Sequence, residues 1–184
     1  VALSNDLDCG TTQLALDGIS VDLNGKTLTT ANNWGGISLK SGASIKNGTI
    51  THAGNTAAIK AFNGSSVENV TINATCATAD KTVTGIAAQQ GANVESIKNV
   101  TINGVSQGIE VGYQATVGLI EKAVVNESNN GTAKGIALVI NGGKVGKAKD
   151  CTFKGETYGV TMHLKGVFAV GLELENCQVE GTTA

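Results

Sequence analysis

The chain of 184 residues contains no proline and no arginine, and only 3% of its residues are aromatic. Without proline, every peptide group after the first residue can donate a hydrogen bond, which suits a chain built mostly of strands. Without arginine, the chain lacks the planar guanidinium that grips phosphates and carboxylates at two points. The composition therefore disfavours sites for nucleotides and for carboxylate-rich sugars.

Charge and long apolar runs are also scarce. The formal net charge is −2, which argues against nucleic acid or an anionic membrane as a partner. No apolar run approaches the roughly 18 residues of a membrane-spanning helix, so we expect no membrane span. Because the chain starts at Val1 and carries no signal peptide, we expect it to be a piece of a longer protein.

What the sequence does have is an internal repeat. A small residue followed by a β-branched one returns every 22 to 27 residues, at Gly36-Ile37, Ala58-Ile59, Gly85-Ile86, Gly108-Ile109, Gly135-Ile136 and Gly159-Val160. A second motif, typified by KNVTIN, returns in parallel at residues 46–51, 68–73, 98–103, 121–126, 149–154 and 175–180. Such a period with uneven steps is typical of a solenoid whose loops vary in length.

The second motif alternates apolar and polar residues, which indicates a strand. Its copies share one order, so we expect parallel strands stacked about 4.8 Å apart. The two inward columns would be Gly48, Val70, Val100, Ala123, Cys151 and Cys177, and then Ile50, Ile72, Ile102, Val125, Phe153 and Val179. The predicted fold is an all-β, single-stranded, right-handed parallel β-helix (solenoid) of about seven coils. We expect one domain over residues 1–184, with a cap at 1–13 and coils at 14–181.

A ladder of asparagines is expected beside the first inward column. The position before that column holds Asn24, Asn47, Asn69, Asn99, Lys122, Asp150 and Asn176. An amide is donor and acceptor at once, so stacked asparagines can bond to one another. We expect Asn69 and Asn99 to point inward at a corner of the coil.

These asparagines, the VTIN strands and the phrase VDLNGKTL at residues 21–28 resemble right-handed parallel β-helix proteins with pectin-lyase-like coils, especially repetitive secreted and surface proteins of bacteria. The resemblance covers roughly residues 14–181. It implies an extracellular or cell-surface location and a non-catalytic structural or adhesin-like module, with polysaccharide or host glycan as a partner. A carbohydrate-active enzyme (polysaccharide lyase or hydrolase), or a degenerate relative of one, is the alternative, and a viral fibre segment is the second alternative.

Catalytic residues are hard to find in this pattern. The six aspartates do not share an outward position on adjacent coils, and Glu110 has no partner carboxylate on the outward side of the Gly-Ile strand. His52 and His163 are five coils apart, and we expect both on the solvated surface. We therefore expect no catalytic residue, no cofactor and no metal.

A polar face offers the best binding hypothesis. The outward side of the KNVTIN strands carries Thr49, Thr71 and Thr101 in one column and Asn73 and Asn103 in the next. Such an array could bind a glycan or, less favourably, ice, with Trp34 as the other place that offers a large ring. The simpler interpretation is that threonine is a good polar strand former that stacks well on itself.

Two features of the ends and the core stay open. Cys151 and Cys177 share an inward column and are expected to be buried thiols, because stacked parallel residues seldom offer the geometry of a disulfide. A disulfide between them is the alternative. The last coil shows no amphipathic cap, so end-to-end contact with another chain or a missing domain is a further expectation.

Overall fold

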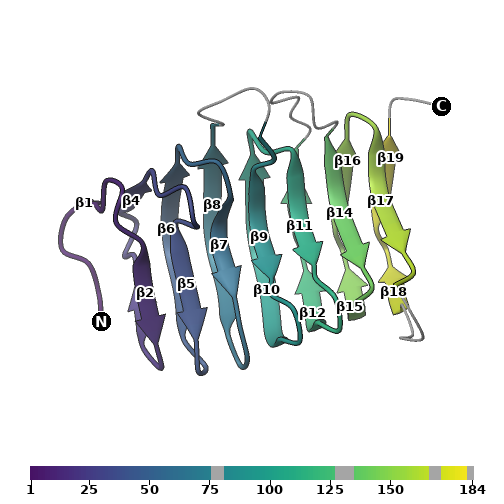
Figure 1. Ribbon diagram of the computed structural model, residues 1–184, viewed down its shortest axis with the longest axis horizontal. Helices are drawn as coiled ribbons and strands as arrows, with labels where there is room; N and C mark the ends of the chain where they lie inside the picture. The colour runs from purple at the N-terminus through teal and green to yellow at the C-terminus, as the bar shows by residue number, and fades with distance from the viewer. Residues whose placement is uncertain (76–80, 127–134, 166–170, 182–184) are drawn as a thin grey trace.

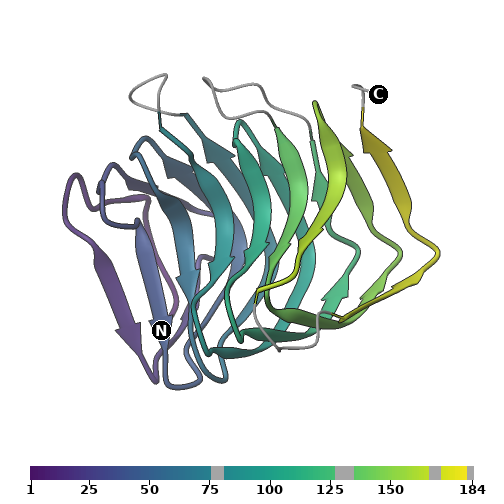
Figure 2. The same ribbon diagram turned by 45° about the vertical axis from the view of Figure 1, so that its right-hand side comes forward.

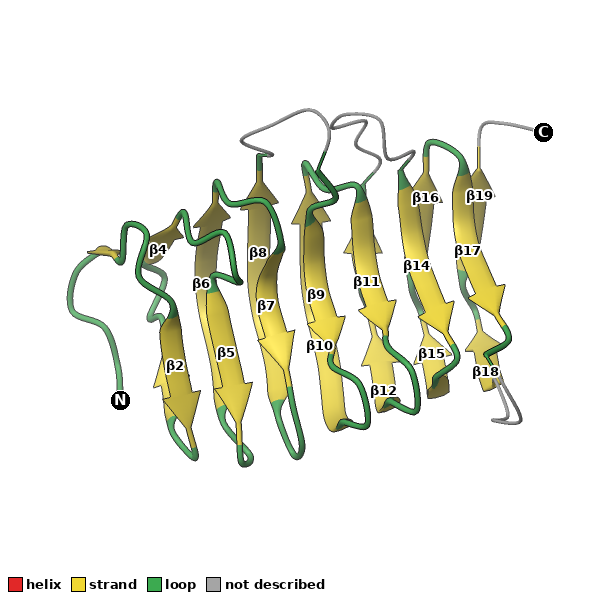
Figure 3. Ribbon diagram, viewed as in Figure 1, coloured by secondary structure: helices red, strands yellow, loops and turns green. Residues whose placement is uncertain are grey.

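The computed structural model describes residues 1–75, 81–126, 135–165 and 171–181 (Figure 1). This part of the chain is all-β, and its parallel strands stack into a β-solenoid of about seven turns (Figure 3). The predicted fold class is confirmed. No helix of the described residues is long and apolar enough to cross a membrane.

The front sheet, which faces the viewer in Figure 1, holds one strand from each coil. Its seven strands are β2 (Leu14–Asp17), β5 (Ile37–Lys40), β7 (Ala57–Ala61), β9 (Thr84–Ala88), β11 (Gln107–Val111), β14 (Ile136–Asn141) and β17 (Tyr158–His163). All their pairings are parallel.

The back sheet has twelve strands. Some coils contribute one long bent strand, and the others contribute two short strands, which raises the number. They are β1 (Leu7–Asp8), β3 (Ser20–Asp22), β4 (Thr27–Thr30), β6 (Ser44–His52), β8 (Ser66–Ala74), β10 (Asn93–Asn103), β12 (Thr116–Glu121), β13 (Val124–Val125), β15 (Lys144–Lys149), β16 (Thr152–Gly155), β18 (Gly171–Glu175) and β19 (Gln178–Gly181). Figure 2 shows the coils side by side along the long axis, from the purple N-terminal coil to the yellow C-terminal coil.

A narrow aliphatic core fills the space between the two sheets. Ile50, Ile72 and Ile102 lie in register on adjacent coils and are fully buried, and Phe153 continues the same column. Val179, the last member, is 42% exposed because no described strand lies beyond it. Stacking like on like extends one core along the axis, as in other solenoids.

The predicted repeat at Gly135-Ile136 is out of register with the structure. Ile109 pairs with Leu138, and Leu138 pairs with Val160. The residues that match Gly108-Ile109 are therefore Ala137-Leu138 and not the predicted Gly135-Ile136. The shift of two residues preserves the alternation of inward and outward side chains, so local pattern alone could not reveal it.

A left-handed backbone residue bends each coil within the back sheet. All seven residues of the predicted ladder have φ between 49° and 59°, including Lys122 and Asp150. Asparagine and aspartate adopt this conformation at lower cost than most other residues, which explains why they dominate the column. The bend lets one sheet wrap around the core.

Candidate binding surfaces

The outer surface of the back sheet carries the predicted threonines and asparagines in register. Thr49, Thr71 and Thr101 are paired on adjacent coils, and Asn73 pairs with Asn103 in the next column. The Asn103 amide donates to Asn73 Oδ1 at 2.9 Å, and Asn126 donates to Asn103 Oδ1 at 2.7 Å. We call this surface the Thr/Asn face.

The asparagines at the bend border the Thr/Asn face. Asn69 donates to Asn47 Oδ1 at 3.0 Å, Asn99 donates to Asn69 Oδ1 at 2.7 Å, and Asn47 donates to Asp22 Oδ2 at 3.1 Å. Asn69 and Asn99 are exposed, so the expectation that they point inward is wrong. The left-handed bend turns these side chains to solvent while the following residue points into the core.

The other two asparagines of the ladder lie at the two ends of the molecule. The Asn24 amide reaches the backbone oxygen of Leu3 at 3.2 Å, and the Asn176 amide donates to Asp150 Oδ1 at 2.6 Å. Asn24 thus links the first coil to the N-terminal segment through Leu3, and Asp22 links the first coil to the second through Asn47. The pKa of Asp22 is lowered, first by a hydrogen bond from the Asn24 backbone and then by the Asn47 amide.

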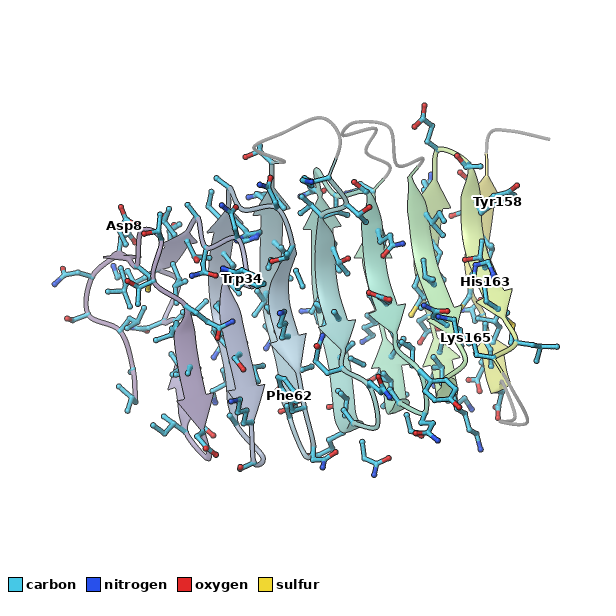
Figure 4. All side chains as sticks on the ribbon, in the orientation of Figure 1. Asp8, Trp34, Phe62, Tyr158, His163 and Lys165 are labelled. Atoms are coloured by element: carbon cyan, nitrogen blue, oxygen red, sulfur yellow. The ribbon has the colours of Figure 1, made fainter. Side chains whose placement is uncertain are left out.

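Trp34 does not belong to the Thr/Asn face. It lies in the connection between β4 and β5, where its backbone N–H donates to Asn32 Oδ1 at 2.7 Å, and its side chain is 80% exposed (Figure 4). Trp34 thus belongs to a corner loop and not to the strands that carry Thr49, Thr71 and Thr101.

The front sheet carries a groove that the sequence pattern did not predict. Lys60, Ala87 and Glu110 are in register on three adjacent coils. Ala87 is only 4% exposed, since the longer side chains on both sides rise above it. This difference in side-chain length creates a hollow of about 250 Å³, whose lining includes Thr84, Gln89 and Gln107.

A second hollow of about 270 Å³ continues the first toward the C-terminus. Gln89 and Glu110 line both hollows, and Tyr113, Asn141 and Lys165 line the second. Lys165 follows β17, toward the C-terminal end of the molecule (Figure 4). We call the two hollows together the front groove.

Glycine shapes the second hollow. Gly112 provides part of its wall, where a Cβ would approach the Ala88 carbonyl oxygen at 2.9 Å. A Cβ on Gly142 would lie 2.9 Å from Cδ2 of Tyr113, so the ring packs directly against that backbone. The pattern that could have revealed the groove is a small residue between long ones in an outward column, here Ala87 between Lys60 and Glu110.

The front groove is polar and has both charges. Among its described lining residues, Glu110 is the one carboxylate, and Lys60 and Lys165 are the cations. Thr84 donates to Gln107 Oε1 at 3.3 Å, which orients an amide at one wall. Within the described residues, no three His, Cys, Asp or Glu side chains form a group that could hold a metal ion.

His52 is fully buried, so the expectation of a solvated side chain is wrong, whereas His163 is exposed. Strand β6 continues its alternation past Ile50, which turns His52 inward against Gly36 and Gly54. Neither ring nitrogen has a hydrogen-bond partner among the described residues. Burial lowers the pKa of His52 below its ordinary 6.5; backbone groups of Thr30 and Thr56 oppose this shift without being aligned for a hydrogen bond.

The described cysteines are free thiols. Cys151 is buried, its thiol lies 3.1 Å from the backbone oxygen of Lys149, and burial raises its pKa to about 11. Cys177 lies 3.3 Å from the backbone oxygen of Ala148. The expectation of free thiols rather than a disulfide agrees with this arrangement, but the expected burial holds only for Cys151, because Cys177 is half-buried.

The chain matches no protein-family model, no curated protein and no solved structure. The class that the fold defines is the parallel β-solenoid. The likeness to pectin-lyase-like coils therefore rests on the sequence pattern.

Proposed function

We propose that this chain is a non-catalytic module of a secreted or cell-surface bacterial protein and that it binds a polysaccharide in the front groove. The observation that carries the proposal is the continuity of the two hollows through Gln89 and Glu110, with the Tyr113 ring in the C-terminal one. The secreted bacterial setting is supported by the resemblance of the repeat.

The side chains of the groove suit sugar hydroxyls. Gln89, Gln107 and Asn141 supply amides that both donate and accept, and Thr84 supplies a hydroxyl. An aromatic ring offers an apolar surface on which the C–H face of a sugar can rest. Because the groove crosses several coils, its length suits a chain of sugars better than a single one.

Binding to a panel of neutral and charged polysaccharides tests the proposal, with Tyr113→Ala and Gln89→Ala as groove variants. The matched control is Thr71→Lys combined with Thr101→Lys, which changes the Thr/Asn face and leaves the groove intact. Loss of binding in the groove variants alone supports the proposal. Loss of binding in the Thr71→Lys/Thr101→Lys variant alone would place the site on the Thr/Asn face instead. If the unmodified protein binds no polysaccharide, the proposal is wrong.

Glu110 is the one observation that favours the enzymatic alternative, since a groove carboxylate could act as a general acid or base. Paired carboxylates are the usual requirement for glycoside hydrolysis. We expect no release of sugar products from pectate, polygalacturonate or related polymers, with or without Ca²⁺. Turnover that disappears in Glu110→Gln would establish an enzyme instead.

A further inference from the structure

Glu110 places a carboxylate without a charged partner in the middle of the front groove. It lines both hollows. None of the ion pairs among the described residues involves it. Its in-register neighbours are Ala87 on one side and Val139 on the other, and each of them is only 4% exposed. The carboxylate therefore stands between two uncharged residues, at the point where the two hollows meet.

The back sheet arranges its acids differently. One outward column there alternates acids and lysines from coil to coil, so that each charge has an opposite charge beside it. In register from the first coil to the last, the column reads Asp22, Lys46, Glu68, Lys98, Glu121, Lys149 and Glu175. No such pairing between coils accounts for the acid at position 110.

Lys60, which shares an outward column with Glu110, leans away from it. The two residues are two coils apart, with Ala87 between them. Lys60 Cε lies 2.8 Å from the position that a Cβ on Gly35 would take, and Gly35 belongs to the preceding coil. The end of the Lys60 side chain therefore lies toward the N-terminal side, whereas Glu110 is on the C-terminal side.

Lys165 lies at the far end of the groove. A Cβ on Gly142 would meet Lys165 Cβ and Tyr113 Cδ2, each at 2.9 Å, so the lysine stem starts beside the ring. Lys165 follows Thr161 by four residues, and Thr161 is two coils from Glu110 in register. The backbones of Lys165 and Glu110 are therefore roughly 15 Å apart. The centre of the front groove is thus acidic, and its C-terminal end is basic.

We propose that the front groove selects polysaccharides that carry free amino groups, and that the Glu110 carboxylate binds one ammonium group of the sugar chain. This selectivity rests on the polysaccharide binding proposed above and adds the class of sugar. A hydrogen bond between an ammonium and a carboxylate is roughly twice as strong as one between neutral groups. Gln89 and Gln107 line the same hollow, and their amides suit the hydroxyls beside the amine. An acidic sugar would instead meet a like charge at Glu110.

The probes are two oligosaccharides of equal length and linkage, a β-1,4-linked hexamer of glucosamine and the same hexamer with every amine acetylated. Acetylation removes the positive charge and keeps the rings and their hydroxyls. At about pH 6, below the ordinary pKa of such an amine, the glucosamine hexamer should bind about fivefold or more tightly in titration calorimetry. Salt should reduce this preference, because it screens charges at a surface.

Two acid variants locate the charge that selects the sugar. Glu110→Gln should bring the two hexamers to equal affinity. The matched control is Glu95→Gln, which removes an exposed acid from β10 of the back sheet and should leave the preference unchanged. Melting curves at the same pH confirm that both variants fold. The proposal is wrong if the unmodified protein binds both hexamers equally or if Glu110→Gln keeps the preference. It is also wrong if Glu95→Gln abolishes the preference, since the net charge of the protein would then be its source.

These outcomes differ from a failure of polysaccharide binding itself. If Tyr113→Ala and Gln89→Ala abolish binding of a polysaccharide without amines while the two hexamers bind equally, the groove binds sugars and the selectivity for amines is wrong. If neither the hexamers nor any other polysaccharide binds, both proposals are wrong.

Discussion

Asn99 donates its side-chain amide to Oδ1 of Asn69 across 2.7 Å, and both residues have a left-handed backbone, with φ of 49° and 53°. One residue type thus satisfies two demands at this bend. Asparagine tolerates positive φ better than most residues, and its amide links one coil to the next.

The two demands can be separated by substitution. Asn99→Leu loses the amide and places a branched side chain at positive φ, so we expect the free energy of unfolding to fall by about 1–3 kcal/mol. Asn99→Gly keeps the backbone conformation and loses only the amide, so its loss should be about 1 kcal/mol or less. Urea denaturation measures both, and equal stability of the two variants would contradict a role for the left-handed bend.

His52 should make stability depend on pH. Because its pKa is lowered in the folded state, the unfolded chain takes up the proton first as the pH falls. The contribution of neutral His52 is complete above about pH 6.5 and is lost as the pH falls toward the lower folded pKa. Thermal melts between pH 8 and pH 4 should show this loss. His52→Gln, which does not titrate, should flatten the curve in that window, and an unchanged curve would exclude His52 as its source.

Gly48 should not tolerate even alanine, although its column continues with Val70, Val100 and Ala123. A Cβ at Gly48 would lie 2.5 Å from Leu23 Cβ and 2.6 Å from the Lys26 oxygen. We expect Gly48→Ala to cost about 1–3 kcal/mol through overpacking. The control is Gly171→Ala, whose Cβ would meet only the flexible Lys144 side chain at 3.3 Å or more and should change the melting temperature little.

The Cys151 thiol should react slowly with iodoacetamide at pH 8. Its pKa is raised to about 11, chiefly by burial, so little thiolate is present. Mass spectrometry should find Cys151 unmodified in the folded protein and modified after unfolding in urea without reductant. If Cys151 and Cys177 are labelled only after reduction, they form a disulfide and the arrangement of two free thiols is wrong.

Local residue patterns are enough to predict the solenoid and its back sheet. Period-two alternation in the KNVTIN strands assigns Ile72 and Ile102 to the core and Thr71 and Thr101 to the surface, and the pairing agrees. Alternation is a local property of an extended chain, since successive side chains point to opposite sides. The same rule applied to His52, two residues after Ile50, would have placed it inside, so the expectation of a surface histidine went against the alternation.

Three features depend on contacts between neighbouring coils and could not be predicted from local patterns. Whether Ile136 or Leu138 matches Ile109 depends on how an unequal loop lets two coils stack, and both choices keep the alternation. The outward direction of Asn69 and Asn99 follows from backbone φ. The hollow over Ala87 exists because Lys60 and Glu110, which lie far from it in the chain, flank it in the sheet. Each of these outcomes comes from contacts between residues about one coil apart, and local residue patterns do not encode the loop lengths and packing that bring those residues together.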